Sequence, residues 1–303
     1  MHEPADPRLL IIGAHPDDAE YHAGGLAAIY SGLGYCVKML SVTDGSAGHF
    51  SRPADELISL RRQESTRAGK VIGAVYETLG FPDGHLLPNL DVRHRIIREI
   101  REFRPDLVLT HRVCDYHPDH RATGQAVQDA SYLVTVPLVL PEVPPLSRDP
   151  VFAYMADLFT RPVRLRADVV IDVGDYLDTI VEMLACHASQ FFEWLPYHDG
   201  ILESVPDDEL HRREWLHNWY AKRSESVTDH FRDEIVSTFG IEAGRRIIYS
   251  EVYEISEYGS SVDAKRLTKL FPSGRSPSSP FAPSNGHLGR NGLMTNHERQ
   301  HSG

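Results

Sequence analysis

The strongest constraint on the fold is the regular alternation of short apolar segments with amphipathic segments over the first 110 residues. Each apolar segment has the length and composition of a buried strand, and each segment between them carries apolar residues at helical spacing. The predicted strands are 9–12, 36–42, 75–79 and 107–110, and the predicted helices run from Ala19, over 56–72 and over 92–103. Such alternation is typical of a doubly wound α/β fold. We therefore predict a Rossmann-like, mostly parallel sheet flanked by helices.

The second half of the chain predicts a smaller α+β portion. Its expected elements are helices from Ala122 to about Val134 and over 176–187, one or two helices within 191–240, and strands near 152–157, 169–172 and 246–255. We expect residues 1–258 to form one domain, with a core at 8–135 and a C-terminal part at 150–255 that walls a pocket or forms a satellite core. Residues 273–303 are rich in Ser, Pro, Gly and Asn, which predicts a disordered tail.

Composition excludes several classes of partner. The chain has 31 basic and 43 acidic residues, a net charge of −12, and no run of Lys or Arg, which argues against binding nucleic acid or an anionic membrane. No apolar stretch approaches the roughly 18 residues of a membrane span. The first residues lack the features of a signal peptide, so we expect a cytoplasmic protein. Cys36, Cys114 and Cys186 form no CxxC pair and are expected to be buried small side chains in a reducing compartment.

Polar residues follow the end of every predicted strand in the first half. Asp44 and Asp83 follow the second and third strands, and His111 ends the fourth. The densest group is His15, Asp17 and Asp18, between the first strand and the first helix. Asp18 alone would also suit a helix N-cap, with Asp17 favoured by the helix dipole. Because the carboxyl ends of parallel strands meet at one edge, where ligands bind in open α/β sheets, we expect these groups to converge.

A second group, His117-Pro-Asp-His120, follows the fourth strand and suggests a metal site shared with the first group. His15, Asp18 and His120 would supply two nitrogens and one carboxylate, a set that suits zinc and also ferrous iron, with one position open for water. Asp17 is then placed to take a proton from that water, and His117 to donate to an oxyanion or a leaving amine. Asp119 would orient His117 or cap the following helix.

These motifs carry a resemblance to a known family. His15-Pro-Asp-Asp18 followed by Gly24-Gly25, together with His117-Pro-Asp-His120, resembles the PIG-L/LmbE-like de-N-acetylases. The similarity covers roughly residues 8–255 and includes weaker features. These are Thr43-Asp-Gly45, Arg61 with Glu64, Gly80-Phe-Pro-Asp-Gly84, His187-Ala-Ser-Gln190 and Tyr249-Ser-Glu-Val-Tyr253.

The resemblance implies a catalytic domain that removes acetyl from N-acetylglucosamine conjugates and releases acetate. It implies one zinc per chain held by His15, Asp18 and His120, with Asp17 as general base and His117 as general acid or oxyanion stabiliser. Arg61 and Asp83 would face the sugar. Some members of the family cleave other amides, in sugar or thiol conjugates.

Two rival functions stay open, together with the identity of the substrate. Tyr21-His22 departs from the commoner forms of the family, and His22 is a further candidate substrate contact. A nucleotide-binding module without catalysis is one rival, but Gly13 is followed by Ala-His-Pro and not by a G-x-G-x-x-G fingerprint. A phosphoesterase would need more metal ligands than this single set. The expected partner is a small amino sugar, and a homo-oligomer is compatible with the sequence.

Overall fold

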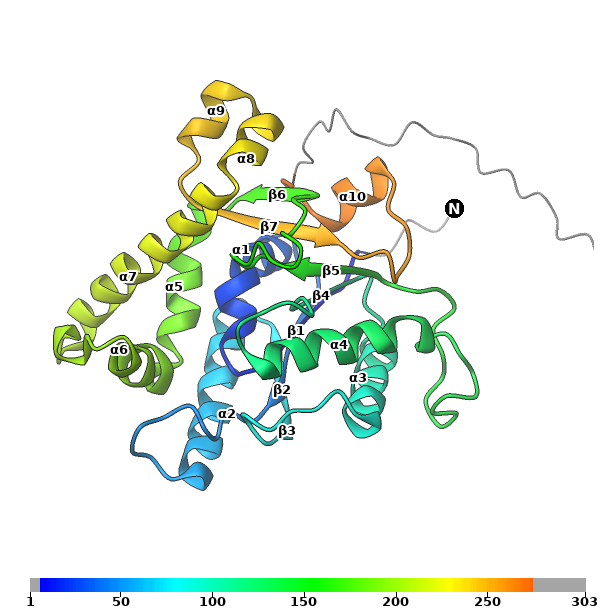
Figure 1. The fold of residues 1–303 in the computed structure, drawn as a ribbon, viewed down its shortest axis with the longest axis horizontal. Helices are drawn as coiled ribbons and strands as arrows, with labels where there is room; N and C mark the ends of the chain where they lie inside the picture. The colour runs from blue at the N-terminus through cyan, green and yellow to red at the C-terminus, as the bar shows by residue number, and fades with distance from the viewer. Residues whose placement is uncertain (1–5, 275–303) are drawn as a thin grey trace, which may run out of the picture.

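A seven-stranded sheet forms the centre of the computed structural model, which describes residues 6–274 (Figure 1). The strand order is β3-β2-β1-β4-β5-β7-β6, and strands β1 to β5 run parallel to one another. β7 runs antiparallel to both β5 and β6. The bounds are β1 Leu9–Gly13, β2 Val37–Thr43, β3 Val75–Phe81, β4 Leu107–Thr110, β5 Val151–Met155, β6 Val169–Asp172 and β7 Ser250–Ile255. The predicted mostly parallel, Rossmann-like sheet is confirmed.

Helices cover both faces of the sheet. The main helices are α1 Asp18–Gly32, α2 Ala54–Val71, α3 Leu90–Phe103, α4 Pro118–Leu133, α5 Leu177–Ala185, α7 Glu209–His230, α8 Arg232–Phe239 and α10 Ala264–Leu270. Because successive strand residues point to opposite faces, Leu9 and Ile11 join the core beneath α1 and α5, whereas Leu10 and Ile12 join the core beneath α3 and α4. All four side chains are fully buried, which explains the continuous apolar run.

The strand order creates a crevice at one edge of the sheet. From β1 the chain proceeds outward to β2 and β3, and then returns to the other side of β1 to form β4 and β5. In such a fold the connections after β1 and β4 diverge, so a ligand crevice opens beyond their carboxyl ends. His15 and His120 follow these two strands, and the expected convergence of polar groups at this edge is therefore met.

Several predicted bounds differ from the structure. α4 begins at Pro118 and not at Ala122, because proline suits the first turn of a helix and His117 serves as its N-cap. The last strand begins at Ser250, since the short helix α9 Ile241–Arg246 precedes it. The segment predicted as one or two helices contains the π-helix η2 Ser189–Trp194, the short helices α6 Leu195–His198 and η3 Leu202–Ser204, then α7 and α8.

The structure corrects the expectation that the cysteines are buried. Cys36 is exposed because it lies in the turn before β2, and Cys114 and Cys186 are half-buried. All three are free thiols.

Packed structure continues past residue 258, since Phe271 is buried and the Tyr30 hydroxyl donates to the Leu270 carbonyl at 2.6 Å. Most of the predicted tail, residues 275–303, lies outside the described residues. Within residues 6–274 no helix is long and apolar enough to cross a membrane.

Helix α1 is interrupted beside the crevice, and a distant strand repairs the interruption. Ala23 has non-helical dihedrals (φ −144°, ψ 20°). The buried carboxylate of Glu251, in β7, accepts hydrogen bonds from the backbone N–H of Gly25 (2.6 Å) and Leu26 (2.9 Å). A Cβ atom at Gly25 would lie 2.4 Å from Val173 Cγ1, so this close approach requires glycine. Packing thus explains the second glycine of the Gly24-Gly25 pair.

Glu251 should make the stability of the protein depend on pH. Burial raises the pKa of its carboxyl from 4.5 to about 7. Between these two pH values the folded chain therefore keeps a proton on Glu251 that the unfolded chain has lost. The free energy of unfolding should therefore fall as pH rises from about 4.5 to 7, by up to about 3 kcal/mol from this group. Chemical denaturation at pH 5 and pH 8 measures the effect. The advantage of wild type over Glu251→Gln should shrink between these pH values. An equal pH dependence of the unfolding free energy in the two proteins would refute the assignment.

Candidate active site

A strained turn joins β1 to α1 and carries the first group of polar residues. Asp17 has φ 121°, a region that non-glycine residues rarely occupy and that costs about 1–3 kcal/mol. Its backbone N–H donates to the Tyr76 hydroxyl at 3.1 Å, which helps to hold the turn. Asp18 is the first residue of the helix and not its N-cap, and its Oδ2 accepts from the His15 backbone N–H at 2.7 Å. The turn therefore points both carboxylates into the crevice edge from adjacent positions.

His15, Asp18 and His120 form a compact triangle at the ends of β1 and β4. His15 Nδ1 lies 3.2 Å from His120 Nε2 and 3.4 Å from Asp18 Oδ2, and His120 Nε2 lies 3.4 Å from Asp18 Oδ1. Ligand atoms bound at about 2.0–2.2 Å to a tetrahedral ion are separated by roughly 3.3–3.6 Å. The three side chains thus have nearly the spacing that one metal ion requires.

The outward nitrogens of both histidines face carboxylates. His15 Nε2 lies 3.2 Å from Asp83 and 3.4 Å from Asp119, and His120 Nδ1 lies 3.1 Å from Asp115. Metal-bound histidines commonly have such a carboxylate partner, which fixes the tautomer and raises the basicity of the ligand nitrogen. The donor set and its surroundings fit a divalent metal ion.

The pKa values of His120 and Asp18 are shifted in opposite directions, each toward its charged form. Burial opposes the charge on His120, but Asp18 and Asp115 outweigh it and raise the pKa of the imidazole to about 9. Burial likewise opposes the ionisation of Asp18, yet His120 and His111 hold the pKa of this carboxyl well below its usual value. Positive charge is therefore stabilised between the two rings and Asp18, as a bound cation would also require.

Asp17 and His117 stand beside the triangle with different protonation tendencies. Burial, followed by the charge of Asp18, raises the pKa of the Asp17 carboxyl to about 7. The ring of His117 lies 4.5 Å from that of His15, edge to face. His117 Nδ1 accepts from the Asp119 backbone N–H at 3.2 Å, so the neutral ring carries its proton on Nε2. Burial and the neighbouring His15 lower the pKa of His117, which favours this neutral form.

Asp119 has a different partner from the one expected. Its carboxylate accepts from the backbone N–H of Gly84 (2.7 Å) and Leu86 (3.2 Å), and faces His15. It therefore orients His15 and not His117, and it does not cap α4, whose N-cap is His117. The expectation failed because the loop after β3, which supplies these N–H groups, approaches α4 only in the folded chain.

The predicted sugar-facing residues are both buried. Arg61 Nη2 donates to the Gly48 carbonyl at 2.8 Å and to the Gln190 side chain. Burial opposes ionisation of Asp83, but His15 and the Ala47 N–H lower the pKa of this carboxyl to about 2. Both side chains thus support the loop 44–53 on the β2 and β3 side of the triangle.

The structure adds two residues to which the sequence assigned no role. Buried His111 places its Nε2 3.1 Å from Asp18 Oδ2 and stacks on His120 with ring centroids 4.0 Å apart. Asp115 supports His120 as described. The sequence places His111 at the end of the fourth predicted strand, but a single histidine there does not indicate which side chains it contacts. His22, predicted to contact the substrate, lies near His120 and not near Arg61 and Asp83. The ring centroids of His22 and His120 are 6.4 Å apart.

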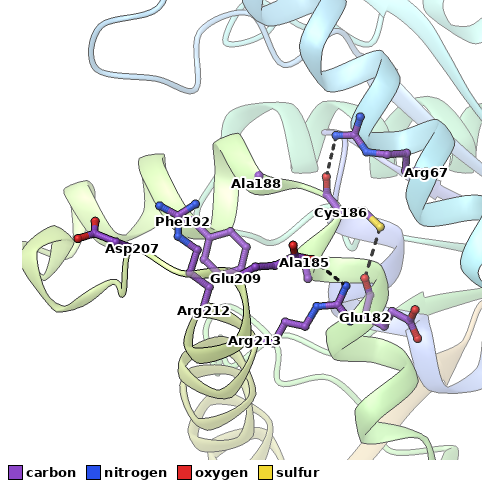
Figure 2. A pocket seen from close by; sticks show the side chains of 10 residues that line it. All are labelled: Arg67, Glu182, Ala185, Cys186, Ala188, Phe192, Asp207, Glu209, Arg212 and Arg213. Carbon is purple, nitrogen blue, oxygen red and sulfur yellow. Dashed lines mark hydrogen bonds and ion pairs between the residues drawn. The ribbon is translucent and has the colours of Figure 1, made fainter.

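A separate cavity of about 470 Å³ lies between α2, α5, η2 and α7 (Figure 2). Its walls carry three arginines, Arg67, Arg212 and Arg213, and three acidic residues, Glu182, Asp207 and Glu209. These charges balance, and none of the residues that line this cavity belongs to the triangle or its partners. This cavity is therefore distinct from the candidate site at the β1–β4 edge.

Comparison with known proteins gives one family and relatives of two activities. Residues 10–131 match the family PIG-L, described as GlcNAc-PI de-N-acetylase. The chain is 28% identical over 224 residues to a probable N-acetyl-α-D-glucosaminyl L-malate deacetylase 2 of Bacillus anthracis, covering 69% of this chain and 91% of the relative. It is 24% identical over 196 residues to the 4-oxalmesaconate hydratase of Pseudomonas putida, covering 62% and 76%.

Solved structures agree on the fold. The N,N'-diacetylchitobiose deacetylase of Pyrococcus horikoshii superimposes with a TM-score of 0.63 at 20% identity, covering 83% of this chain and 84% of that one. The mixed sheet with its flanking helices is thus shared.

The triangle makes a direct prediction about metal content. Purified protein should hold about one divalent ion per chain, and His15→Ala, Asp18→Ala and His120→Ala should each lose most of it, because two ligands rarely retain an ion. Elemental analysis after dialysis measures the occupancy. His198→Ala, an exposed histidine outside the site, is the control and should keep the ion. Full occupancy in all three ligand variants would show that the ion binds elsewhere.

Proposed function

The chain carries a PIG-L family domain, and from that premise we propose that it is a metal-dependent hydrolase that removes the N-acetyl group from an N-acetylglucosamine-type conjugate. Zinc is the proposed ion, with ferrous iron as the alternative, because two imidazoles and one carboxylate suit both. The observation that carries the proposal is the His15–Asp18–His120 triangle with Asp17 and His117 beside it. A structural metal site would close its fourth position with another protein ligand, whereas a hydrolytic site keeps it open.

The metal, when bound, would acidify a water molecule and polarise the amide carbonyl. Asp17 is the proposed general base that accepts the proton of the attacking water. Its raised pKa, about 7, makes it a better proton acceptor than an ordinary carboxylate.

His117 is the proposed donor to the developing oxyanion. Its Nε2–H would stabilise the oxyanion of the tetrahedral intermediate, and the proton that Asp17 accepted from the water would pass to the nitrogen as the C–N bond breaks. The products are acetate and the free amine. The Asp119 backbone N–H supports this role, since it occupies Nδ1 and leaves Nε2 as the donor.

The sugar is proposed to lie on the β2 and β3 side of the triangle, over the loop 44–53. Arg61 and Asp83 hold this loop through Gly48 and Ala47, so their contribution to sugar binding would include the shape of the loop. The proposed substrate is a small amino-sugar conjugate.

Replacement of Asp17 distinguishes a general base from a metal ligand. Asp17→Asn keeps the size of the side chain but cannot accept the proton, so the variant should retain the metal while its turnover falls by about 10²-fold or more. Metal analysis and steady-state kinetics on the same preparation measure both quantities. Asp18→Asn is the matched comparison and should lose metal together with activity. Near-normal turnover of Asp17→Asn, or loss of its metal, would assign Asp17 another role.

The test of the reaction itself is acetate release from N-acetylglucosamine, its disaccharide, and glycoside or thiol conjugates. The hydratase relative sets the competing outcome, addition of water to a carbon–carbon double bond. If the protein bleached the ultraviolet absorbance of an unsaturated dicarboxylic acid and released no acetate from any amide, the proposal would fail.

A further inference from the structure

A second cavity adjoins the metal triangle on the side away from the loop 44–53. It has a volume of about 360 Å³ and lies between α1, the loops that follow β4 and β5, helix α7 and the start of β7. Figure 1 labels these helices and strands. We call it the apolar pocket. Its wall includes Tyr21, Tyr116, Leu158, Phe159, Tyr220 and Val227. This size is within the range of pockets that bind small molecules.

The carboxylates and the arginine that line the apolar pocket are engaged with other protein groups. Asp157 forms a bidentate ion pair with Arg112, at 2.5 and 2.7 Å. Glu251 accepts from the backbone of α1, and the Ser250 hydroxyl lies 2.9 Å from that of Thr228. Arg223 pairs with Asp199 and stacks over the Trp219 ring. A ligand in the pocket therefore meets mainly apolar surface.

The wall of the pocket reaches one of the proposed metal ligands, His120. Asp115 and Tyr116, both in its wall, contact His120, with the Tyr116 ring centroid 5.4 Å from that of His120. His22 also lines the pocket. Asp83 lies behind the other ligand ring, that of His15. The triangle thus separates the apolar pocket, on the β5 and β7 side, from the proposed sugar side at β2 and β3.

These positions identify what the pocket holds. The amide carbonyl must lie at the triangle, so with the sugar nitrogen on one side the carbon substituent of the carbonyl points to the other. We infer, on the basis of the proposed function, that the apolar pocket binds the acyl group of the substrate. The protein would then accept N-acyl amino sugars whose acyl group is apolar and larger than acetyl. Water adds to the carbonyl, the C–N bond breaks, and the carboxylate of the longer acyl group leaves with the free amine.

The volume supports a larger acyl group. Acetyl has three non-hydrogen atoms and would leave most of 360 Å³ unfilled by substrate. Each further methylene group placed against the apolar wall contributes about 0.8 kcal/mol, or roughly fourfold in affinity when fully buried. The apolar wall of the pocket should therefore make the protein favour longer acyl groups.

A series of N-acyl glucosamines tests the inference through amine release. From acetyl through butanoyl and hexanoyl to octanoyl, kcat/KM should rise by about tenfold or more, since several methylene groups are buried. A parallel series of alkyl glycosides of N-acetylglucosamine, with acetyl constant, should show no comparable rise. A flat acyl series alongside normal acetyl turnover would overturn the inference and leave the proposed function intact. A rise in the glycoside series alone would also overturn it, because the pocket would then hold the aglycone.

A variant that fills the pocket gives a second readout. Ser226 is an exposed residue of α7 that lines the pocket, so Ser226→Phe should reduce the octanoyl-to-acetyl ratio of kcat/KM by about tenfold without unfolding the protein. Glu225→Phe, on the adjacent exposed position outside the pocket wall, should keep the wild-type ratio. Equal ratios in wild type and Ser226→Phe would contradict the inference.

Binding of the product octanoate, measured by calorimetry, requires no turnover. Octanoate should bind wild type at least about tenfold more tightly than acetate, and Ser226→Phe should lose this preference. If no amide is cleaved but octanoate shows this pattern, the proposed function fails and the apolar pocket stands. If octanoate binds no better than acetate, the pocket assignment fails.

Discussion

The structure of the site depends on the concentration of carboxylates around two imidazoles at the point where the strand order reverses. His15 and His120 are 105 residues apart, yet they face each other at 3.2 Å with Asp18 between them. Asp83, Asp115 and Asp119 close the outer sides of the two rings. Such an arrangement is favourable only if positive charge balances it, through protons on the histidines or through a cation. The folding of the crevice and its affinity for metal thus have the same electrostatic origin.

The backbone prepares this arrangement before any ligand arrives. The turn at Asp17 is strained, and Gly13 permits it, because a Cβ there would lie 2.5 Å from Asp18 Cβ. Neighbouring elements hold the turn in place: Tyr76 bonds the Asp17 backbone N–H, and Thr43 Oγ1 donates to the Ala14 carbonyl at 2.7 Å. Tertiary contacts therefore offset the local strain, as is common at functional sites.

The sequence predicts the central sheet and the triangle well because both have local signatures. Fully buried strands such as Leu9–Gly13 read as apolar runs, and His15, Asp18 and His120 stand in short motifs at their ends. Partners determined by tertiary approach were not predictable in the same way. The bond from Asp119 to the loop after β3 and the stacking of His111 on His120 depend on helix placement, which no local pattern encodes. The elements within 191–240 were less predictable for a related reason, since the aromatic residues there pack on one another and against the core beneath α1 and α5.

The hydrogen bond between Glu251 and Gly25 joins residues separated by 226 positions, nearly the whole described chain. The helix it completes is the one that carries Asp18, so the turn with the proposed base is joined directly to the last strand. During synthesis, the N-terminal strands leave the ribosome long before β7 exists. Until then α1 lacks the acceptor for two of its backbone donors, at the place where it packs most closely. Acquisition of a competent site is therefore expected to be a late event of folding, limited by a contact of very high sequence separation.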